Sequence, residues 1–278
     1  MTQTAMYSFA RRMRLSRLFH TQSSRLLVVP LDHSVAEGPL RTKGTIKELV
    51  ASLARGGVDA VILHRGSVRY VCAQAFKETS LIIHLSASTK HAPDPDSKYL
   101  VADVEEAIRL GADAVSVHVN LGSDNEVQQI RDFAAVAAEC DRWNLPLLSM
   151  VYPRGPRTTD PRDPSLVAHA VSLAVDIGAD IVKTVYTGSP ESMAEIISGS
   201  PIPVLVAGGS RVADPAELGE FVEEILGSGA AGLAMGRNIF ESHNPEATAR
   251  CIADVVHSRH PRSVLNSVFT RANHPQFM

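Results

Sequence analysis

A lysine stands inside an apolar, β-branched stretch of this 278-residue sequence. The stretch GADIVKTVYTG covers residues 178–188, and Lys183 lies between Val182 and Thr184. Burying an unpaired ammonium costs free energy, so a lysine at this place needs a physical reason. One explanation is a side chain whose stem packs in the strand while its ammonium reaches a carboxylate at the rim. The other is a desolvated, neutral amine that attacks a carbonyl carbon.

Candidate acid–base partners for such an amine come at the ends of two other apolar stretches. RLLVVPLDH ends in Asp32 and His33, and LPLLSMVYP contains Tyr152. A carboxylate and a phenol can accept and donate the protons that imine formation and hydrolysis require. Together with Lys183, they favour a nucleophilic amine over a structural one.

Glycines next to an arginine form a second candidate constellation. VAGG ends in Gly208 and Gly209, and MGRN contains Gly236 and Arg237. Glycine lets backbone N–H groups approach a phosphate closely, and an arginine adds a charged fork. A Gly-Gly pair alone is also typical of a tight turn. Because the second stretch follows one apolar run later, we interpret the two together as a phosphate site.

Histidines raise a metal-site alternative, since His33, His64, His84 and His118 end four successive apolar runs. A metal-dependent aldolase or hydrolase could use such a set. The chain has no HxH or HxxxH pair among these histidines, and few carboxylates accompany them. We therefore expect them to line a site or to form hydrogen bonds, and we predict neither a metal nor a cofactor.

An internal repeat indicates the elements that position these residues. Four segments each begin with a glycine that ends an amphipathic helical pattern, and an apolar run follows. They are GGVDAVILH (56–64), GADAVSVHV (111–119), GADIVKTVY (178–186) and GAAGLAMGR (229–237). Four further apolar runs fill the gaps, in residues 25–33, 81–86, 145–153 and 202–209.

Eight apolar strands alternating with helices, at an average spacing of about 30 residues, predict an α/β fold of the (β/α)8 TIM-barrel class. A doubly wound open sheet is the alternative, but no GxGxxG follows the first strand, which disfavours dinucleotide binding. Active sites of such barrels form at the carboxyl ends of the strands. The candidate residues end their strands, so one rim is expected to collect them.

The expected organisation is a single domain with short additions. We predict an N-terminal helical extension over residues 1–24, the barrel over 25–260 and a C-terminal tail over 261–278. The extension has an amphipathic pattern that suits a lid on the closed end of the barrel or a subunit contact. A targeting role is disfavoured, because the basic N-terminus lacks an apolar core segment.

Composition excludes several classes of protein. The net charge is −3, 45 % of residues are hydrophobic and 21 % are charged, so neither nucleic acid nor a membrane is an expected partner. No apolar run approaches the roughly 18 residues that a membrane span requires. Three scattered cysteines suggest reduced thiols. We expect a cytoplasmic protein.

Six motifs in order resemble one family. VVPLDHSVAEGP, VSVHVNLGSD, MVYPRG, DIVKTVYTG, VAGG and MGRNIF are similar to segments of the archaeal-type class I aldolases, in the fructose-bisphosphate aldolase and deoxyribose-phosphate aldolase superfamily. Within it the resemblance is greatest to the 2-amino-3,7-dideoxy-D-threo-hept-6-ulosonate synthases. One departure is Ser34, because the family has glycine after the Asp-His pair.

The resemblance implies roles for particular residues. It implies that Lys183 forms the Schiff base, that Tyr152 is the proton donor and that Asp32 is the proton acceptor. It also implies a set of substrate- and phosphate-binding residues: His33, Ser34, Gly38, Pro153, Arg154, Gly208, Gly209, Gly236 and Arg237.

The function so implied is that of an aldolase or transaldolase acting on a phosphorylated ketose, in a homo-oligomer. Our main expectation is transfer of a three-carbon ketone unit from 6-deoxy-5-ketofructose 1-phosphate to L-aspartate semialdehyde. The alternative is a simple aldolase that cleaves fructose 1,6-bisphosphate or condenses dihydroxyacetone phosphate with aspartate semialdehyde. A silent phosphate-binding barrel is disfavoured, because it needs no Lys183, Tyr152 and Asp32 together.

Overall fold

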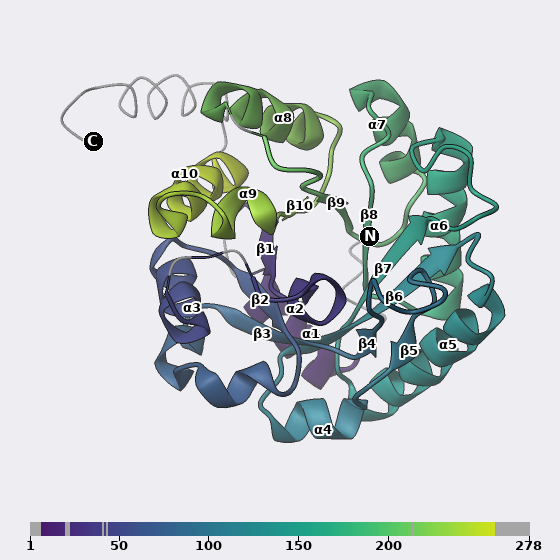
Figure 1. Ribbon diagram of the computed structural model, residues 1–278, viewed down its shortest axis with the longest axis horizontal. Coiled ribbons are helices and arrows are strands. Elements are labelled where there is room, and N and C mark those ends of the chain that lie inside the picture. The colour runs from purple at the N-terminus through teal and green to yellow at the C-terminus, as the bar shows by residue number, and fades with distance from the viewer. Residues whose placement is uncertain (1–6, 20–22, 41, 43, 213, 259–278) are drawn as a thin grey trace.

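Eight parallel strands form a closed barrel, as the repeat predicts (Figure 1). The computed structural model describes residues 7–19, 23–40, 42, 44–212 and 214–258. Around the barrel the hydrogen-bonded order is β1-β10-β9-β8-β7-β6-β3-β2. The strands are β1 (Leu26–Pro30), β2 (Ala60–Leu63), β3 (Ser80–His84), β6 (Ala114–Leu121), β7 (Leu147–Pro153), β8 (Ile181–Thr184), β9 (Val204–Ala207) and β10 (Gly232–Ala234). The predicted TIM-barrel fold is therefore confirmed.

Helices surround the barrel, and a small hairpin, β4 (Ser86–Ala87) with β5 (Tyr99–Leu100), follows β3. The main helices are α3 (Ile46–Arg55), α4 (Val104–Arg109), α5 (Glu126–Trp143), α6 (Pro164–Ile177), α7 (Pro190–Ser198), α8 (Pro215–Gly227) and α10 (Pro245–His257). Their ends follow local chemistry. Asp163 caps the first turn of α6, and Gly178 ends that helix with a φ of 103°, the left-handed conformation that glycine adopts without strain.

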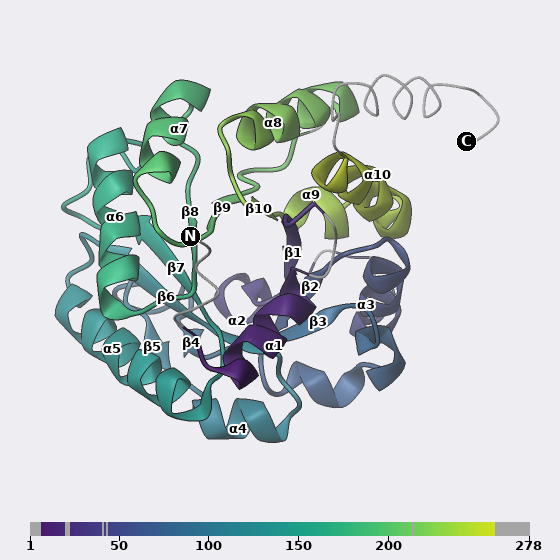
Figure 2. The same cartoon turned by 180° about the vertical axis from the view of Figure 1, so that it is seen from behind.

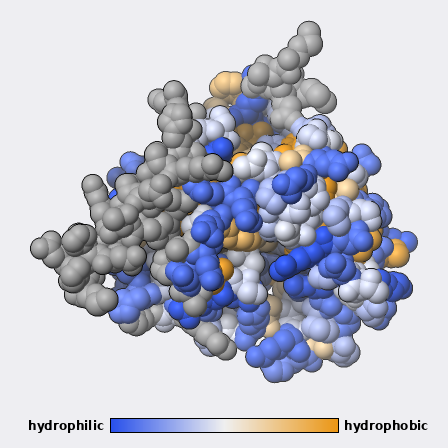
Figure 3. Space-filling model, turned by 90° about the horizontal axis from the view of Figure 1, so that it is seen from above, coloured by the Kyte–Doolittle hydropathy of each residue, from blue (hydrophilic) through white to orange (hydrophobic). Residues whose placement is uncertain are grey.

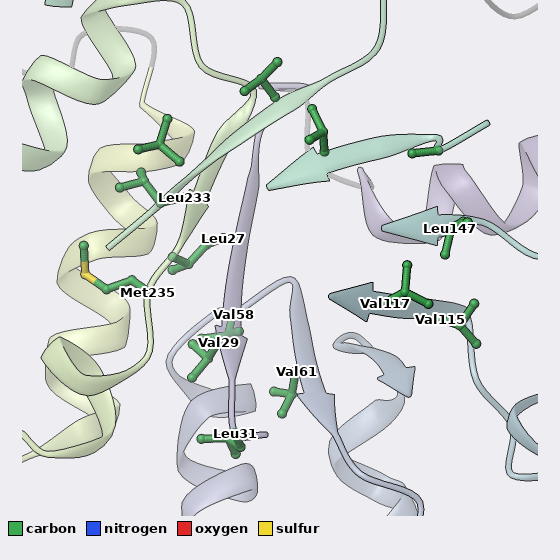
Figure 4. Close-up of a cluster of buried hydrophobic side chains, with 14 of the residues drawn as sticks. Leu27, Val29, Leu31, Val58, Val61, Val115, Val117, Leu147, Leu233 and Met235 are labelled. Atoms are coloured by element: carbon green, nitrogen blue, oxygen red, sulfur yellow. The ribbon is translucent and has the colours of Figure 1, made fainter. Parts of the chain in front are cut away.

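The strands separate two apolar cores, because successive side chains point to opposite faces of a strand. Leu27 and Val29 belong to the outer core between strands and helices, shown in Figure 4. Leu26 and Val28 belong to the inner core, which fills the barrel itself. Burial on both faces explains why each strand reads as a continuous apolar run.

The aspartates of the repeat have a structural task at the amino ends of the strands. The Leu27 N–H donates to Asp59 at 2.6 Å, the Leu81 N–H to Asp113 at 3.0 Å and the Leu147 N–H to Asp180 at 2.8 Å. Each carboxylate thereby fastens the beginning of the neighbouring strand. An aspartate at the same place in three of the four repeats follows from this shared geometry.

The expected N-terminal helix, α1 (Phe9–Leu18), lies across the amino end of the barrel (Figure 2). Leu15, Leu18 and Phe19 pack on the inner core. On the same helix and beneath the barrel, Arg11 Nε lies 3.5 Å from Asp180 and Arg17 Nε lies 3.1 Å from Asp113. The helix therefore closes this end with both apolar and charged contacts.

The proposed domain boundaries remain a prediction, since the expected tail over 261–278 lies outside the described residues. Figure 3 shows a surface that is mostly hydrophilic, with hydrophobic residues in separate small groups. In the described part of the chain, the search for a helix both long and apolar enough to cross a membrane finds none.

Candidate active site

A cavity of about 250 Å³ opens at the carboxyl ends of the strands, on the side that faces the viewer in Figure 1. Nine of the twelve predicted site residues line it: Asp32, His33, Tyr152, Arg154, Lys183, Gly208, Gly209, Gly236 and Arg237. The cavity joins contributions from strands that are far apart in the sequence.

The structure does not bring Ser34, Gly38 and Pro153 to the cavity lining. Ser34 and Gly38 belong to the short helix α2 (His33–Glu37) and its end, where the Gly38 N–H donates to the Ser34 carbonyl. Pro153 follows Tyr152 in β7, so the alternation of a strand turns it to the opposite face. Contact of these three with substrate remains a prediction.

Lys183 points into the barrel from β8, and the residue is 6 % exposed. In the described residues, the hydrogen bond assigned to Nζ is a weak one to Met150 Sδ at 4.0 Å, and no carboxylate lies within salt-bridge distance of that nitrogen. The stem-and-rim explanation requires a carboxylate partner. Its absence among the described residues favours the nucleophilic explanation of Lys183.

Tyr152 lies beside the lysine, with Nζ of Lys183 6.0 Å from the centre of its ring. The pairing of Met150 with Lys183 across β7 and β8 sets this neighbourhood, because Tyr152 is two residues further along the same face. His118 packs edge-on against the phenol at 5.0 Å between ring centres. Burial, with nearby Lys98 and His84, holds the pKa of His118 well below its usual range, so a neutral ring supports the tyrosine.

Asp32, the third predicted catalytic residue, follows the end of β1. Its Oδ1 is buried and has no hydrogen-bond partner in the described structure. His33 Nδ1 lies 3.9 Å from Oδ1, and His84 Nε2 lies 3.8 Å from Oδ2. Burial alone would raise the pKa of this carboxyl, but His84, His33 and Lys183 outweigh it and hold that pKa below its usual range. The group is therefore ionised at neutral pH and has a free acceptor.

Two neighbouring histidines, His84 and His64, are uncharged at neutral pH. Burial lowers the pKa of His84 to about 4, against the attraction of Asp32, and burial also lowers the pKa of His64. His84 Nδ1 lies 2.8 Å from Ser116 Oγ, and His64 Nε2 lies 3.2 Å from the Asp32 carbonyl. These contacts orient the rings around Asp32, as the expectation of lining and hydrogen-bonding roles requires.

The predicted phosphate site lies where β9 and β10 end. A Cβ on Gly236 would lie 3.0 Å from Phe240 and 3.1 Å from His33, and a Cβ on Gly208 would lie 2.7 Å from the Met235 side chain. Packing alone therefore favours glycine at both positions. Arg237 begins the short helix α9 (Arg237–Phe240) and donates to the Gly209 carbonyl at 3.2 Å.

Asn238, which we assigned no role from the sequence, holds the two glycine loops together. Its side-chain amide donates to the carbonyls of Gly208 at 3.0 Å and Ser210 at 3.1 Å, and it accepts from the Val212 N–H at 2.7 Å. The motif MGRN contains this residue, so its position next to Arg237 was the available signal. Asn238 is buried and positions the loops rather than contacting a ligand.

Lys98 is a cavity residue to which the sequence analysis assigned no role. It does not end a barrel strand but belongs to the loop between β4 and β5. Because these strands have two residues each, no periodicity marks the hairpin. The histidines do not assemble a metal centre: within the described ranges, no group of three or more His, Cys, Asp or Glu side chains could hold an ion.

Comparison with known proteins gives a consistent family. Residues 26–242 match the model of the family described as DeoC/LacD family aldolase. A 2-amino-4,5-dihydroxy-6-oxo-7-(phosphonooxy)heptanoate synthase of Streptomyces griseus is 57 % identical over 250 residues, which cover 90 % of this chain and 91 % of the relative.

More distant relatives also match over most of this chain. A 2-amino-3,7-dideoxy-D-threo-hept-6-ulosonate synthase 1 of Archaeoglobus fulgidus is 40 % identical over 90 % of this chain and 92 % of its own length. A solved archaeal fructose-1,6-bisphosphate aldolase, with its catalytic lysine covalently bound to a carbinolamine intermediate, superposes with a TM-score of 0.81. It is 26 % identical and covers 89 % of this chain and 100 % of the other.

Proposed function

Because the chain belongs to the DeoC/LacD aldolase family and is a class I aldolase, we propose that it condenses dihydroxyacetone phosphate with L-aspartate semialdehyde. The 57 % identical relative is named for a seven-carbon product with a ketone at C6, a phosphate on C7 and a carboxylate at C1. Breaking the C4–C5 bond of that product, between its two hydroxyl-bearing carbons, gives these two substrates. The cavity residues Lys183, Tyr152 and Arg237 suit a phosphorylated ketone.

We prefer the condensation, which the sequence analysis gave as the alternative, to the transaldolase reaction, which it gave as the main expectation. The transaldolase reading rests on relatives that are 38–40 % identical, whereas the relative at 57 % identity is named for the condensation product. Both reactions share the lysine chemistry and differ in which phosphorylated ketose delivers the three-carbon unit. The donor is therefore the point that an experiment has to separate.

The reaction begins when Lys183 Nζ attacks the ketone carbon of dihydroxyacetone phosphate. Tyr152 protonates the departing hydroxyl, and loss of water leaves a positively charged iminium on the lysine. The iminium withdraws electrons from the adjacent hydroxymethyl carbon, which loses a proton to Asp32 and becomes the nucleophilic carbon of an enamine. Proton transfers of this kind contribute typically ~10²–10⁴-fold to a rate.

The enamine carbon then adds to the aldehyde carbon of the acceptor, which forms the new carbon–carbon bond and regenerates the iminium. The aldehyde oxygen takes up a proton and becomes a hydroxyl group. Water adds to the iminium carbon, the carbon–nitrogen bond breaks, and the free amine of Lys183 returns with the ketone product. Asp32 gives the proton it accepted to the aldehyde oxygen, and its restored negative charge then stabilises the positive iminium until water adds.

The observation that carries the proposal is the environment of Lys183 Nζ. This nitrogen is buried at the mouth of the barrel, 6.0 Å from the centre of the Tyr152 ring, with a thioether as its neighbour rather than a carboxylate. A buried amine with no carboxylate close to it costs folding free energy, and such groups are typical of functional sites. Imine formation uses this property directly.

The test has two stages. Dihydroxyacetone phosphate is added, the mixture is reduced with borohydride, and mass spectrometry locates the adduct, which we expect on the peptide that contains Lys183. Aspartate semialdehyde is then supplied with dihydroxyacetone phosphate, and a seven-carbon phosphorylated product is expected. Lys90, an exposed lysine outside the cavity, provides the control: Lys90→Met keeps the adduct and Lys183→Met loses it.

Two results would contradict the proposal. If 6-deoxy-5-ketofructose 1-phosphate supports product formation and dihydroxyacetone phosphate does not, the enzyme is the transaldolase. If neither donor leaves a borohydride-stable adduct, the Schiff-base assignment of Lys183 is wrong.

A further inference from the structure

We infer that Lys98, with Arg154 beside it, binds the carboxylate of the acceptor aldehyde, on the side of the cavity opposite the donor phosphate. The inference rests on the proposed function for the identity of the acceptor. It assigns a role to a residue that lies outside the barrel strands and that neither the motifs nor the family resemblance pointed to. It would give the cavity two anion-binding subsites with the reactive lysine between them.

The order of strands places the two subsites on opposite sides. The loops after β9 and β10 carry the glycines and Arg237, whereas the loop that holds Lys98 rests on the end of β6. In the closed barrel, β6 is four strands from β10 in either direction. The proposed product also has a phosphate at one end of its carbon chain and a carboxylate at the other. Lys98 and Arg237 thus lie on opposite sides of the cavity, as the carboxylate and the phosphate lie at opposite ends of the proposed product.

Contacts with β6 and the following helix hold the loop of Lys98 in place. Asn120 Nδ2 donates to the Asp96 carbonyl at 2.8 Å, and Gln129 Nε2 donates to the same carbonyl at 3.2 Å. Ser123 Oγ lies 3.2 Å from a carboxylate oxygen of Asp94. Because Asn120 and Gln129 are buried, this loop presents Lys98 from a fixed backbone rather than from a free end.

The ammonium of Lys98 keeps one hydrogen-bond donor available for a ligand in the cavity. Nζ donates to Ser88 Oγ at 2.5 Å and, at 3.4 Å, to the Pro95 carbonyl, and both acceptors are neutral. An ammonium has three donors, so one donor and the full charge remain for a ligand. In the described structure, no carboxylate lies within 4.0 Å of this nitrogen.

Arg154 strengthens the positive potential at this place. It lines the cavity as Lys98 does, and its Nε lies 4.0 Å from Asp96 Oδ1, which is too far for a strong ion pair. Burial and Arg154 lower the pKa of Lys98 and outweigh the attraction of the more distant carboxylates of Asp96, Asp32 and Asp94. Two cations that destabilise one another gain from an anion between them, and a carboxylate can accept hydrogen bonds from both.

The experiment compares a charged acceptor with a neutral one. For Lys98→Met we expect the KM for aspartate semialdehyde to rise about 10- to 100-fold, the loss of one charge-assisted hydrogen bond. The KM for propanal, the KM for dihydroxyacetone phosphate and the kcat with either aldehyde should change little. Lys98→Arg should restore the low KM for aspartate semialdehyde, and Lys90→Met serves as the matched control from the same loop.

A second readout does not depend on the natural acceptor. L-2-Aminobutyrate has the carbon chain and carboxylate of aspartate semialdehyde without the aldehyde, and it should inhibit condensation of propanal competitively in the natural protein. Lys98→Met should weaken that inhibition by a similar factor.

Three outcomes overturn the inference. Equal losses with aspartate semialdehyde and propanal would mean that Lys98 supports the fold of the site. Unchanged kinetics, or no inhibition by L-2-aminobutyrate while propanal still reacts, would mean that the carboxylate binds elsewhere. Absence of any adduct and any condensation would instead refute the proposed function, and the inference with it.

Discussion

Both ends of the barrel contain buried charged side chains, but the two ends differ in how these side chains are paired. At the amino end, Asp180 accepts the Leu147 N–H and faces Arg11, and Asp113 accepts the Leu81 N–H and faces Arg17. At the carboxyl end, Lys183 has a thioether neighbour. Asp32 there has an oxygen without a hydrogen-bond partner in the described structure.

One short strand shows the contrast directly. Asp180 and Lys183 are three residues apart, and they are 3 % and 6 % exposed. The carboxylate accepts the Leu147 N–H and lies 3.5 Å from Arg11 Nε, whereas the amine has no carboxylate within 4.0 Å among the described residues and is available for a substrate. Similar burial can therefore accompany a structural or a reactive role. The number of hydrogen-bond and ion-pair partners distinguishes the two.

The largest effect is expected from removing the reactive end. Lys183→Met should lower kcat by about 10⁴- to 10⁶-fold, as losing a covalent nucleophile does in other enzymes. The same change should leave the melting temperature nearly unchanged, because the hydrogen bond it removes is the weak one to Met150 Sδ. Steady-state kinetics and thermal unfolding measure the two quantities. A large loss of stability would show that Lys183 is structural and would remove the contrast with Asp180.

The converse result is expected three residues earlier. Asp180→Ala should lower the free energy of unfolding by about 3 kcal/mol, because it leaves the Leu147 N–H without its acceptor and the inner side of Arg11 without its ion-pair partner. The kcat of the folded protein should stay close to that of the natural protein. Urea denaturation tests this, with Asp141→Ala as control.

Asp141 contacts the same arginine from the surface, and 71 % of its side chain is exposed. Its loss is expected to cost no more than about 1 kcal/mol. Equal losses for the two aspartates would contradict the distinction between buried and exposed partners of Arg11.

A pH effect should come from the mouth of the barrel. The pKa of His84 is about 4 in the folded protein against 6.5 for a free histidine. Between these values the unfolded chain binds the proton and the folded protein does not, so stability rises with pH and is lost as pH falls from about 6.5 toward 4.

For this single group the loss between pH 7 and pH 5 is about 2 kcal/mol. His84→Phe should remove that part of the pH dependence of the unfolding free energy, measured by denaturation at several pH values. His64 and His118 shift in the same direction, so some dependence remains. An unchanged slope in the variant would mean that His84 is not neutral when buried.

The smallest effect is expected at the phosphate subsite. Arg237 is partly exposed and its guanidinium already donates to the Gly209 carbonyl, so Arg237→Ala should raise the KM for dihydroxyacetone phosphate by about 10-fold, as loss of one solvent-screened charged contact does. The KM for unphosphorylated dihydroxyacetone should stay the same. An equal rise for both ketones would place the phosphate elsewhere.

Much of the barrel architecture could be predicted because the sequence signals of its strands and helices are local. A glycine that ends a helix, followed by a buried strand, recurs four times, and the spacing of the eight runs specifies the barrel. That Lys183, Tyr152 and Asp32 share one cavity could be predicted because each comes late in a strand or just after one, and parallel strands bring their carboxyl ends to one rim. The positions of Ser34, Gly38 and Pro153 relative to the cavity were harder to predict from the sequence. They depend on the short helix α2 and on the alternation of side chains at the end of β7.

By itself, the sequence determined the fold class and the rim that collects the candidate residues, Lys183 among them, since these follow from periodicity and from the place of a residue within a strand. Only the tertiary structure decided which charges are paired, because partners such as Arg11 and Asp180 lie far apart in the chain. It also brought Lys98 to the cavity, through a hairpin too short to leave a periodic signal. Pairing is a property of contacts across the fold, and it is pairing that separates the stabilising end of this barrel from the reactive one.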